Sequence, residues 1–87
     1  MEIRKKVWPE YYAKIVNGTK KWDLRLADFN CRPGDTLILE EWDPKTRKYT
    51  GRTTNRKVAY VVKTRDLKFW PEEEMARYGL QVIQFAD

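Results

Sequence analysis

The chain has 87 residues, a formal net charge of +5, four tryptophans, five tyrosines and three phenylalanines. This length is enough for one domain over residues 1–87 and too short for two. Because Cys31 is the single cysteine and histidine is absent, the composition excludes an intrachain disulfide, the usual zinc ligand sets and every histidine-based catalytic triad. We therefore expect no metal and no cofactor.

Location and partner class follow from charge and hydropathy. No apolar run approaches the roughly 20 residues that a membrane-spanning helix needs, and the N-terminal residues lack the apolar core of a signal peptide. An isolated thiol fits a reducing compartment, so we expect a cytoplasmic protein with no membrane partner. The positive charge favours a nucleic acid partner, although lysines that serve only solubility explain it equally well. The sequence leaves the oligomeric state open, and a monomer is our working assumption.

The first quarter of the chain predicts a strand followed by a helix. Residues 2–8 form a strand candidate, and Pro9 suits the first turn of a helix because the N–H that proline lacks has no helical partner there. Gly18 ends the helix in the left-handed C′ position. The apolar stripe of this helix is formed at i, i+3, i+4 spacing by Tyr12, Ile15 and Val16.

Strict alternation between residues 21 and 26 predicts a strand with two different faces. One face is apolar and carries Trp22, Leu24 and Leu26; the other is charged and carries Lys21, Asp23 and Arg25. We expect the apolar face to anchor the strand and the charged face to meet solvent or a ligand.

The rest of the chain predicts three more strands and one short helix. In order these are a turn over 30–35, a strand over 35–42 with Leu37 and Leu39 on one face, a hairpin connection over 43–51, a strand over 56–63 with Val58, Tyr60 and Val62 on one side, a helix over 72–78 and a strand over 80–85. The order indicates an α+β, mostly β fold: a small, curved, mostly antiparallel sheet or β-barrel whose openings two short helices cover. The aromatic residues expected in its core are Trp8, Trp22, Phe29, Trp70 and Phe85.

Four residues at the helix-to-strand turn follow a G-x-K-x-x-E-x-R spacing, with aspartate in place of the glutamate. They are Gly18, Lys20, Asp23 and Arg25. Together with the "GD" turn and the "EWDP…YTGR" hairpin, they make residues 7–63 resemble the ASCH domain family of the PUA-like superfamily, in its compact subfamily catalogued as a domain of unknown function. The resemblance implies a PUA-like barrel that recognises RNA in a cleft between barrel and helix.

The same residues suggest a binding site by their chemistry. Asp23 and Arg25 lie two apart on one strand face, so the acid can hold the guanidinium while its fork stays available to a phosphate or a base edge. Lys20 can swing over the same face from the turn, and Lys21 adds a further cation. The alternative is a solvated strand face whose charges pair for solubility.

A second basic region lies around the predicted hairpin, and its candidate nucleic-acid-binding residues are Arg47, Lys48, Arg52 and Arg56. Trp42 and Tyr49 lie near these cations, and such interleaving suits single-stranded RNA, whose bases stack on rings while its phosphates attract cations. An ordinary exposed hairpin is equally consistent with the sequence, with Trp42 and Tyr49 as a cross-strand pair.

Three functions remain open. The first is an RNA- or nucleotide-binding module. The second is an RNA-processing enzyme, either a ribonuclease or an amidohydrolase acting on acetylated cytidine, as the resemblance implies for some family members. Such an enzyme would use Lys20 as its base with Asp23 and Glu74, although Asp23 stands where those amidohydrolases carry threonine. The third is a protein-interaction accessory factor, and the net positive charge is the only feature of the sequence that supports it.

Overall fold

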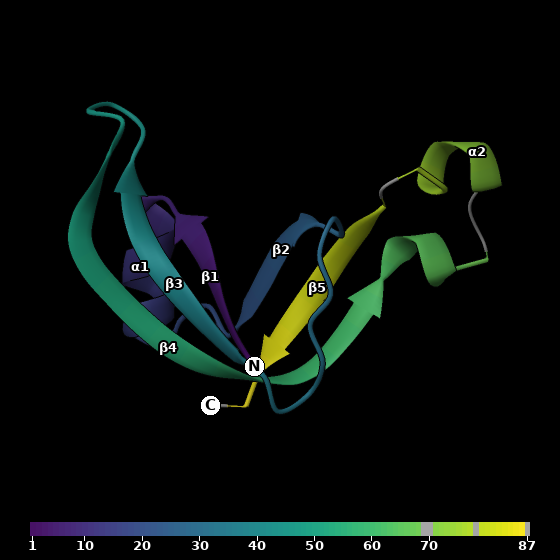
Figure 1. Cartoon of the computed structure of the whole chain (residues 1–87), viewed down its shortest axis with the longest axis horizontal. Coiled ribbons are helices and arrows are strands. Elements are labelled where there is room, and N and C mark those ends of the chain that lie inside the picture. Colours follow the sequence, from purple (N-terminus) through teal and green to yellow (C-terminus); the bar gives the residue numbers. More distant parts are fainter. Residues whose placement is uncertain (69–70, 78, 87) are drawn as a thin grey trace.

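The computed structural model describes residues 1–68, 71–77 and 79–86, with residue 74 described by its backbone alone. Its elements, in chain order, are β1 (Glu2–Val7), α1 (Pro9–Val16), β2 (Trp22–Leu26), β3 (Thr36–Asp43), β4 (Lys48–Lys63), the 3-10 turn η1 (Thr64–Asp66), α2 (Glu72–Met75) and β5 (Leu80–Phe85) (Figure 1). Among the described residues no helix is both long enough and apolar enough to cross a membrane.

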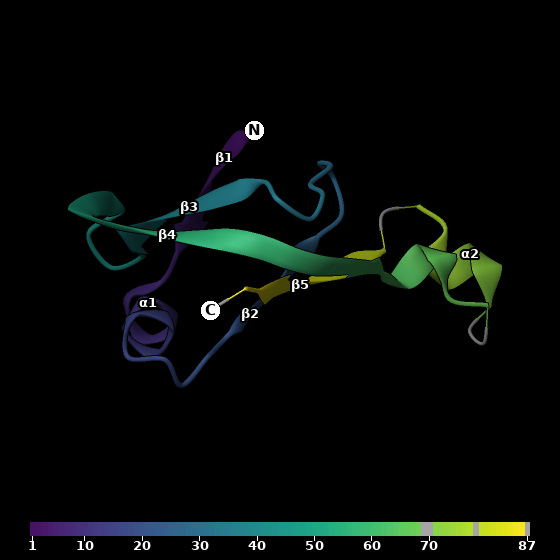
Figure 2. The ribbon, with the colours of Figure 1, turned by 90° about the horizontal axis from the view of Figure 1, so that it is seen from below.

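The strands form one five-stranded sheet in the order β1-β3-β4-β5-β2. β1 pairs with β3 in parallel, and the other three pairings are antiparallel. The long strand β4 pairs with β3 in its first part and with β5 in its last part, so it joins the two halves of the sheet (Figures 1 and 2). The predicted α+β, mostly antiparallel and curved fold is confirmed. The sheet is curled but not closed into a barrel, and β1 and β2 are its two edges in the described part of the chain.

β4 differs from its prediction in length and in facing. It begins at Lys48 because the pairs Trp42–Tyr49 and Asp43–Lys48 extend the ladder with β3 into the predicted connection. A register shift between Val58 and Tyr60 then inserts one extra residue into the strand. Val58 is therefore buried and Tyr60 is 58% exposed, so the predicted common side of Val58, Tyr60 and Val62 was wrong.

The two helices play unequal parts. α1 begins at Pro9 as predicted and packs against β3 with Tyr12 and Ile15 buried, whereas Val16 is half exposed and does not belong to the buried stripe. α2 is shorter than predicted, ending at Met75, while the predicted end at Tyr78 lies outside the described residues. α2 packs against η1 beyond the ends of β4 and β5, at the opposite end of the molecule from α1 (Figures 1 and 2). The expected pair of capping helices is thus reduced to α1.

The core lies inside the curl of the sheet and beneath α1. Its buried residues include Leu37, Leu39, Val58, Ile83 and Phe85. The expected core position of Phe85 is confirmed, and Phe29 packs against the core while partly buried. The expectation was wrong for Trp8 and Trp22, which are 49% and 47% exposed. Trp70 lies outside the described residues.

β2 has its two faces the other way round from the prediction. Asp23 is only 4% exposed, whereas Leu24 and Leu26 are about half exposed. The cause is the register with β5, in which Asp23 pairs with Ile83 and Arg25 pairs with Gln81. Directly paired residues share a face, and Ile83 and Gln81 are both fully buried. The charged face of β2 therefore points into the curl.

Candidate functional site

A cleft of about 580 Å³ opens between the two edge strands of the sheet. Its walls are residues 6–8 at the end of β1, Tyr11 of α1, Lys20, and residues 22–25 of β2. Because β1 and β2 do not pair with each other, the gap between them is the place where the interior of the curl reaches the surface. A cleft of this size falls in the range of small-molecule and cofactor sites.

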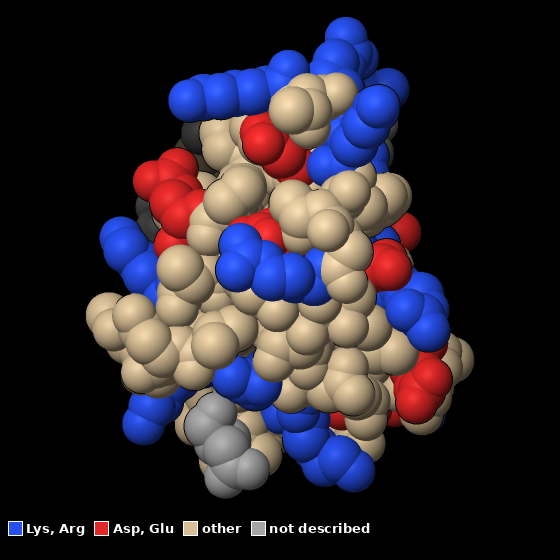
Figure 3. Space-filling model, turned by 90° about the vertical axis from the view of Figure 1, so that its left-hand side faces the viewer, with Lys and Arg blue, Asp and Glu red and all other residues tan. Residues whose placement is uncertain are grey.

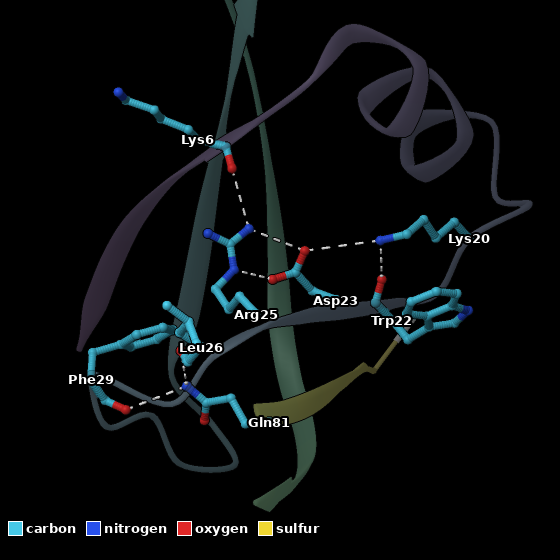
Figure 4. A network of polar contacts seen from close by, with 8 residues as sticks. All are labelled: Lys6, Lys20, Trp22, Asp23, Arg25, Leu26, Phe29 and Gln81. Carbon is cyan, nitrogen blue, oxygen red and sulfur yellow. Dashed lines mark hydrogen bonds and ion pairs between the residues drawn. The ribbon is translucent and has the colours of Figure 1, made fainter. Parts of the chain in front are cut away.

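Asp23 and Arg25 line the cleft, and Figure 4 shows them between Lys6 and Lys20. The guanidinium of Arg25 contacts both carboxylate oxygens: Nε donates to Oδ2, and Nη2 donates to Oδ1 at 3.1 Å. Nη2 also donates to the carbonyl oxygen of Lys6 at 3.3 Å. The contact between Asp23 and Arg25 is the one that their spacing predicted. The contact with Lys6 was not predicted, and through it Arg25 bridges β2 to β1 across the gap that backbone pairing leaves open.

Lys20 enters the cleft from the turn between α1 and β2. Gly18 adopts a φ of +86° there, which glycine tolerates without strain, and the Lys20 backbone N–H donates to the carbonyl of Lys14 at 2.9 Å. The Lys20 ammonium donates to the Trp22 carbonyl at 2.8 Å and lies 3.9 Å from Asp23 Oδ1. Its side chain is only 12% exposed. The motif residues Lys20, Asp23 and Arg25 are therefore brought together.

The burial of Lys20 changes its acid–base properties. Removal from water is the main cause that lowers the pKa of Lys20 from its ordinary value; the nearby positive charge of Arg25 lowers it further, and the Asp23 carboxylate opposes both. The neutral amine is therefore more accessible than in an exposed lysine. The arrangement places a cation of reduced pKa next to a carboxylate that Arg25 already neutralises.

Aromatic side chains line the cleft around Lys20. Its Nζ lies 4.3 Å from the ring centroid of Trp22 and 5.9 Å from that of Tyr11, within the range of cation–π attraction. Trp8, Tyr11 and Trp22 are all between 43% and 49% exposed, so each offers ring surface to a ligand. The sequence predicted Trp8 and Trp22 in the core and gave no role to Tyr11. The position of these three rings beside the helix and the G-x-K turn could have indicated that they line the cleft.

Lys6 contributes to the cleft with its backbone rather than its charge. Figure 4 shows its carbonyl oxygen toward Arg25 and its side chain pointing away. The Lys6 ammonium instead lies 4.5 Å from the ring centroid of Trp42 and 5.9 Å from that of Tyr49. Trp42 and Tyr49 are directly paired across β3 and β4, as one of the two sequence-based alternatives had it.

Two further predicted residues lie apart from the cleft. Lys21 is exposed and is not among the cleft-lining residues. Glu74 belongs to α2, and its side chain lies outside the described part of the structure. The backbone of α2 is at the far end of the sheet from α1 (Figure 1), so the second helix is not brought to this cleft.

The predicted basic hairpin residues divide into two groups. Arg52 donates from Nε to Glu41 Oε1 at 2.7 Å and from Nη2 to Oε2 at 3.0 Å. Arg56 donates to the Ile15 carbonyl at the end of α1 at 3.1 Å and to Thr54 Oγ1 at 2.7 Å. Both guanidinium groups therefore hold parts of the fold together.

Arg47 and Lys48 lie at the tip of the β3–β4 hairpin, where Arg47 has a φ of +58°. Both are exposed. Figure 3 shows the side of the molecule that carries the β3–β4 hairpin. Lysine and arginine side chains gather at its upper end, where the hairpin tip lies. A second hollow of about 450 Å³ runs from Trp8 and Pro9 to Asp43, Pro44 and Lys45. Glu10 also lines this hollow, and Trp8 lines both hollows, so the two lie next to each other at Trp8.

Gln81 and Glu41 are buried polar residues that the sequence reasoning missed. Gln81 shares the inner face with Arg25 and donates from Nε2 to the carbonyl oxygens of Leu26 and Phe29 at 3.5 and 3.4 Å (Figure 4). These contacts support the chain where β2 ends. Glu41 follows Glu40 directly on β3. Because successive residues of a strand point to opposite faces, one of the two acids had to point inward, and Glu41 is the buried one.

Comparison with known proteins shows similarity in sequence and in fold. A protein of Escherichia phage P2, described as an uncharacterized 12.9 kDa protein in the GpA 3' region, is 36% identical over 68 residues. Those residues make up 78% of this chain but only 58% of the phage protein, so less than two-thirds of that relative is matched.

The crystal structure of hypothetical protein PH0355 superimposes with a TM-score of 0.67, covering 98% of this chain and 97% of the other. At 21% sequence identity this likeness shows the fold alone. The family model described as a domain of unknown function, DUF3850, matches residues 4–73, a stretch that includes Lys20, Asp23 and Arg25. The chain therefore belongs to the DUF3850 family.

Proposed function

We propose that the protein binds RNA or a nucleotide in the cleft between β1, α1 and β2. The observation that carries the proposal is the pairing of partly exposed rings with cations in one hollow of about 580 Å³. The rings of Trp8, Tyr11 and Trp22 offer faces on which a base can stack, and Lys20 and Arg25 offer charged donors to phosphate oxygens or base edges.

The balance of charge in the cleft supports an anionic ligand. Asp23 accepts two hydrogen bonds from Arg25 and lies near the Lys20 ammonium. Two cations thus face one carboxylate whose oxygens are already occupied. Because the side chains of Asp23 and Lys20 are only 6% and 12% exposed, this positive charge is screened less by salt than a surface charge would be.

The hairpin tip supports a polynucleotide over a single nucleotide. The second hollow leads from Trp8, at the wall of the cleft, to Lys45 at the start of the hairpin loop. Arg47 and Lys48 follow at the exposed tip. A strand whose base occupies the cleft can extend past Glu10 and Asp43, which also line this hollow, and bring its phosphates to the cations at the tip. Stacking in the cleft and electrostatic attraction at the tip are the combination that single-stranded RNA uses.

The test compares Lys20→Gln with Lys21→Gln in binding to a fluorescently labelled single-stranded RNA oligonucleotide, measured by anisotropy. Both variants remove one charge from adjacent residues, so they alter the general electrostatic attraction equally. Lys20 lines the cleft and Lys21 does not. We expect Lys20→Gln to weaken binding about tenfold or more and Lys21→Gln about threefold or less. Equal losses in both variants would remove the cleft from the proposal.

The hairpin tip is tested by its salt dependence. The double variant Arg47→Gln/Lys48→Gln should lower the slope of log affinity against log salt by about 1 to 2 for single-stranded RNA. It should leave the binding of a mononucleotide unchanged, because one nucleotide fills the cleft alone. An unchanged slope for the oligonucleotide would restrict the ligand to the cleft.

The lowered pKa of Lys20 favours hydrolysis of RNA or of acetylated cytidine as a second candidate function. A lysine that loses its proton more readily can take a proton from water or a ribose hydroxyl, and Lys20 lies at the wall of the cleft. Cleavage of the oligonucleotide, or release of acetate from acetylated cytidine, must then disappear in Lys20→Gln and persist in Lys21→Gln. Absence of turnover in the unaltered protein would leave binding as the function.

A further inference from the structure

The outer face of the half-sheet formed by β2, β5 and the last part of β4 is almost entirely apolar. The registers place Trp22 beside Gln84 and Tyr60, Leu24 beside Val82 and Val62, and Leu26 beside Leu80. Directly paired residues share a face, so these eight positions form one continuous surface. We call its seven apolar members the outer patch: Trp22, Leu24, Leu26, Tyr60, Val62, Leu80 and Val82. Trp22 and Leu24 belong to the edge strand β2 and also line the cleft, so the patch and the cleft meet along this strand.

The outer patch is exposed to an extent that is unusual for a strand face. Leu26 is 51% exposed, Tyr60 58% and Leu80 40%, with Trp22 and Leu24 close to half. With roughly 200 Å² for a large side chain, these five present roughly 500 Å² of mainly apolar surface. This area is in the upper part of the range of the largest apolar patch on ordinary monomers, and such patches often mark interaction sites.

The other half of the sheet shows how a solvent-facing outer surface is built in the same molecule. There most outward positions are charged or polar: Arg4 and Lys6 of β1 face the same side as Glu40 of β3, and Arg4 Nη1 lies 3.5 Å from Glu40 Oε2. The apolar residue on this face, Ile38, pairs with Arg4 and is only 6% exposed. The outer patch has no charged side chain at any of its positions. The two halves belong to one sheet and therefore differ in the side chains that their outer faces carry.

We propose that the outer patch is the interface of a homodimer, in which the patches of two copies pack face to face. Two patches of this size together bury roughly 1,000 Å², which is the lower limit for a specific interface. A two-fold axis needs only one self-complementary surface, and two sheet faces can pack with their side chains interdigitated about 10 Å apart. We expect a dimer that dissociates on dilution.

The distribution of charge favours a second copy as the occupant. Each copy carries a net charge of +5, so two copies approach with least repulsion through a surface that carries no charge. The outer patch is such a surface, and the cations of the hairpin tip and of β1 lie on the other half of the sheet (Figure 1). Lys20 lies beside the edge of the patch, with its ammonium 4.3 Å from the Trp22 ring, so the contact with a second copy should centre on Leu26, Tyr60 and Leu80.

The test is sedimentation velocity of the full chain over a concentration series, with Leu26→Arg as the disrupting variant. For the unaltered protein we expect the average mass to rise from that of one chain, 10.5 kDa, toward twice that value. In Leu26→Arg a charge replaces an apolar contact in both copies, so association should weaken about tenfold or more. A mass that stays at one chain over the whole series would overturn the proposal.

Matched controls separate the interface from general surface effects. Val16→Arg introduces the same charge at a residue with nearly the same exposure, 52%, outside the outer patch. Tyr60→Arg and Tyr49→Arg form a second pair, both tyrosines lying on β4 with exposures of 58% and 53%. We expect Leu26→Arg and Tyr60→Arg to remain monomeric and Val16→Arg and Tyr49→Arg to associate normally. Thermal unfolding by circular dichroism identifies any variant that fails to fold, and the other pair then decides.

Salt distinguishes this interface from RNA binding. Added salt screens the repulsion between two positively charged copies, so dimerisation should be unchanged or stronger. RNA binding should weaken under the same conditions. Dimerisation that falls steeply with salt, or that persists unchanged in both Leu26→Arg and Tyr60→Arg, would place the contact elsewhere.

Discussion

β2 and β3 belong to one sheet, but their inward positions carry different residues: charged ones on β2 and mainly leucine on β3. β3 buries Leu37 and Leu39 completely and sends Glu40 outward. β2 buries Asp23 and leaves Leu24 half exposed. Alternation therefore defines two faces of a strand, and the register with the neighbouring strand decides which face is inside.

The inward charges of β2 have a cost that the inward leucines of β3 do not. A buried ion pair is often no more stabilising than apolar side chains of similar volume, because both charges lose their hydration. Here the pair sits at the open edge of the sheet, where Arg25 also reaches the Lys6 carbonyl across the gap. The position of this pair supports the proposal that the inward residues of β2 bind a ligand, whereas the inward leucines of β3 form part of the core.

The largest effect that tests this comparison is expected from truncating one leucine in each strand. Leu39→Ala should lower the free energy of unfolding by about 3 kcal/mol, because it removes a side chain with no exposed surface and leaves a cavity. Leu24→Ala should lower it by less than about 1 kcal/mol, since half of that side chain is already in water. Denaturant unfolding followed by tryptophan fluorescence measures both.

The two leucine variants must be measured at low protein concentration, where self-association does not add to stability. The comparison fails if Leu24→Ala costs as much as Leu39→Ala under these conditions. A large cost for Leu24→Ala that appears only at high concentration would instead support the homodimer, because Leu24 belongs to the outer patch.

A smaller effect is expected from breaking the ion pair of β2. Arg25→Ala leaves the Asp23 carboxylate buried without its two donors and should lower the free energy of unfolding by about 2 kcal/mol. In the double variant Asp23→Asn/Arg25→Ala the buried carboxylate charge is gone, so part of that loss should be recovered, although the Lys20 ammonium then lacks its neighbouring carboxylate. A double variant that is less stable than Arg25→Ala alone would show that Asp23 has other, stronger partners.

Sequence reasoning reached the order of the elements and the motif residues, since both depend on local patterns. Pro9 and Gly18 bound α1 as predicted because their backbone preferences are local. The facing of β2 could not be predicted, because it depends on pairing with β5 more than fifty residues away. The engagement of Arg52 by Glu41 depends likewise on the register of β3 with β4.

The cleft could be predicted only in its charged part. Lys20, Asp23 and Arg25 lie within six residues, so their spacing alone brings them close together. The ring of Trp8 joins them only because β1 and β2 become opposite edges of a curled sheet. Tryptophan and tyrosine are commonly buried, so composition assigned Trp8 to the core where the topology assigns it to the cleft.

The smallest effect concerns the one carboxylate that β3 buries, Glu41, which is 1% exposed. The Thr50 hydroxyl and the Arg52 guanidinium hold the pKa of Glu41 below its ordinary value of 4.5. A lowered pKa in the folded state stabilises the fold fully above pH 4.5, and this contribution is lost as the pH falls through the lower, folded-state value. Glu41→Gln should therefore lower the free energy of unfolding by about 1–2 kcal/mol at pH 7.

The difference between the unaltered protein and Glu41→Gln should shrink as the pH falls below 4.5, because the buried carboxylate of the former takes up its proton. Glu40→Gln is the matched control: its neighbour on β3 has a side chain that is 26% exposed and contacts Arg4 at 3.5 Å near the surface, so its effect should be below about 0.5 kcal/mol at every pH. A pH-independent loss in Glu41→Gln would mean that shape, not charge, is what Glu41 contributes. The expected pH-dependent loss would show that β3, like β2, holds a buried carboxylate in its charged form. The two strands differ in where the arginine paired with that carboxylate lies: Arg25 lines the cleft, whereas Arg52, together with the Thr50 hydroxyl, holds the hairpin to β3.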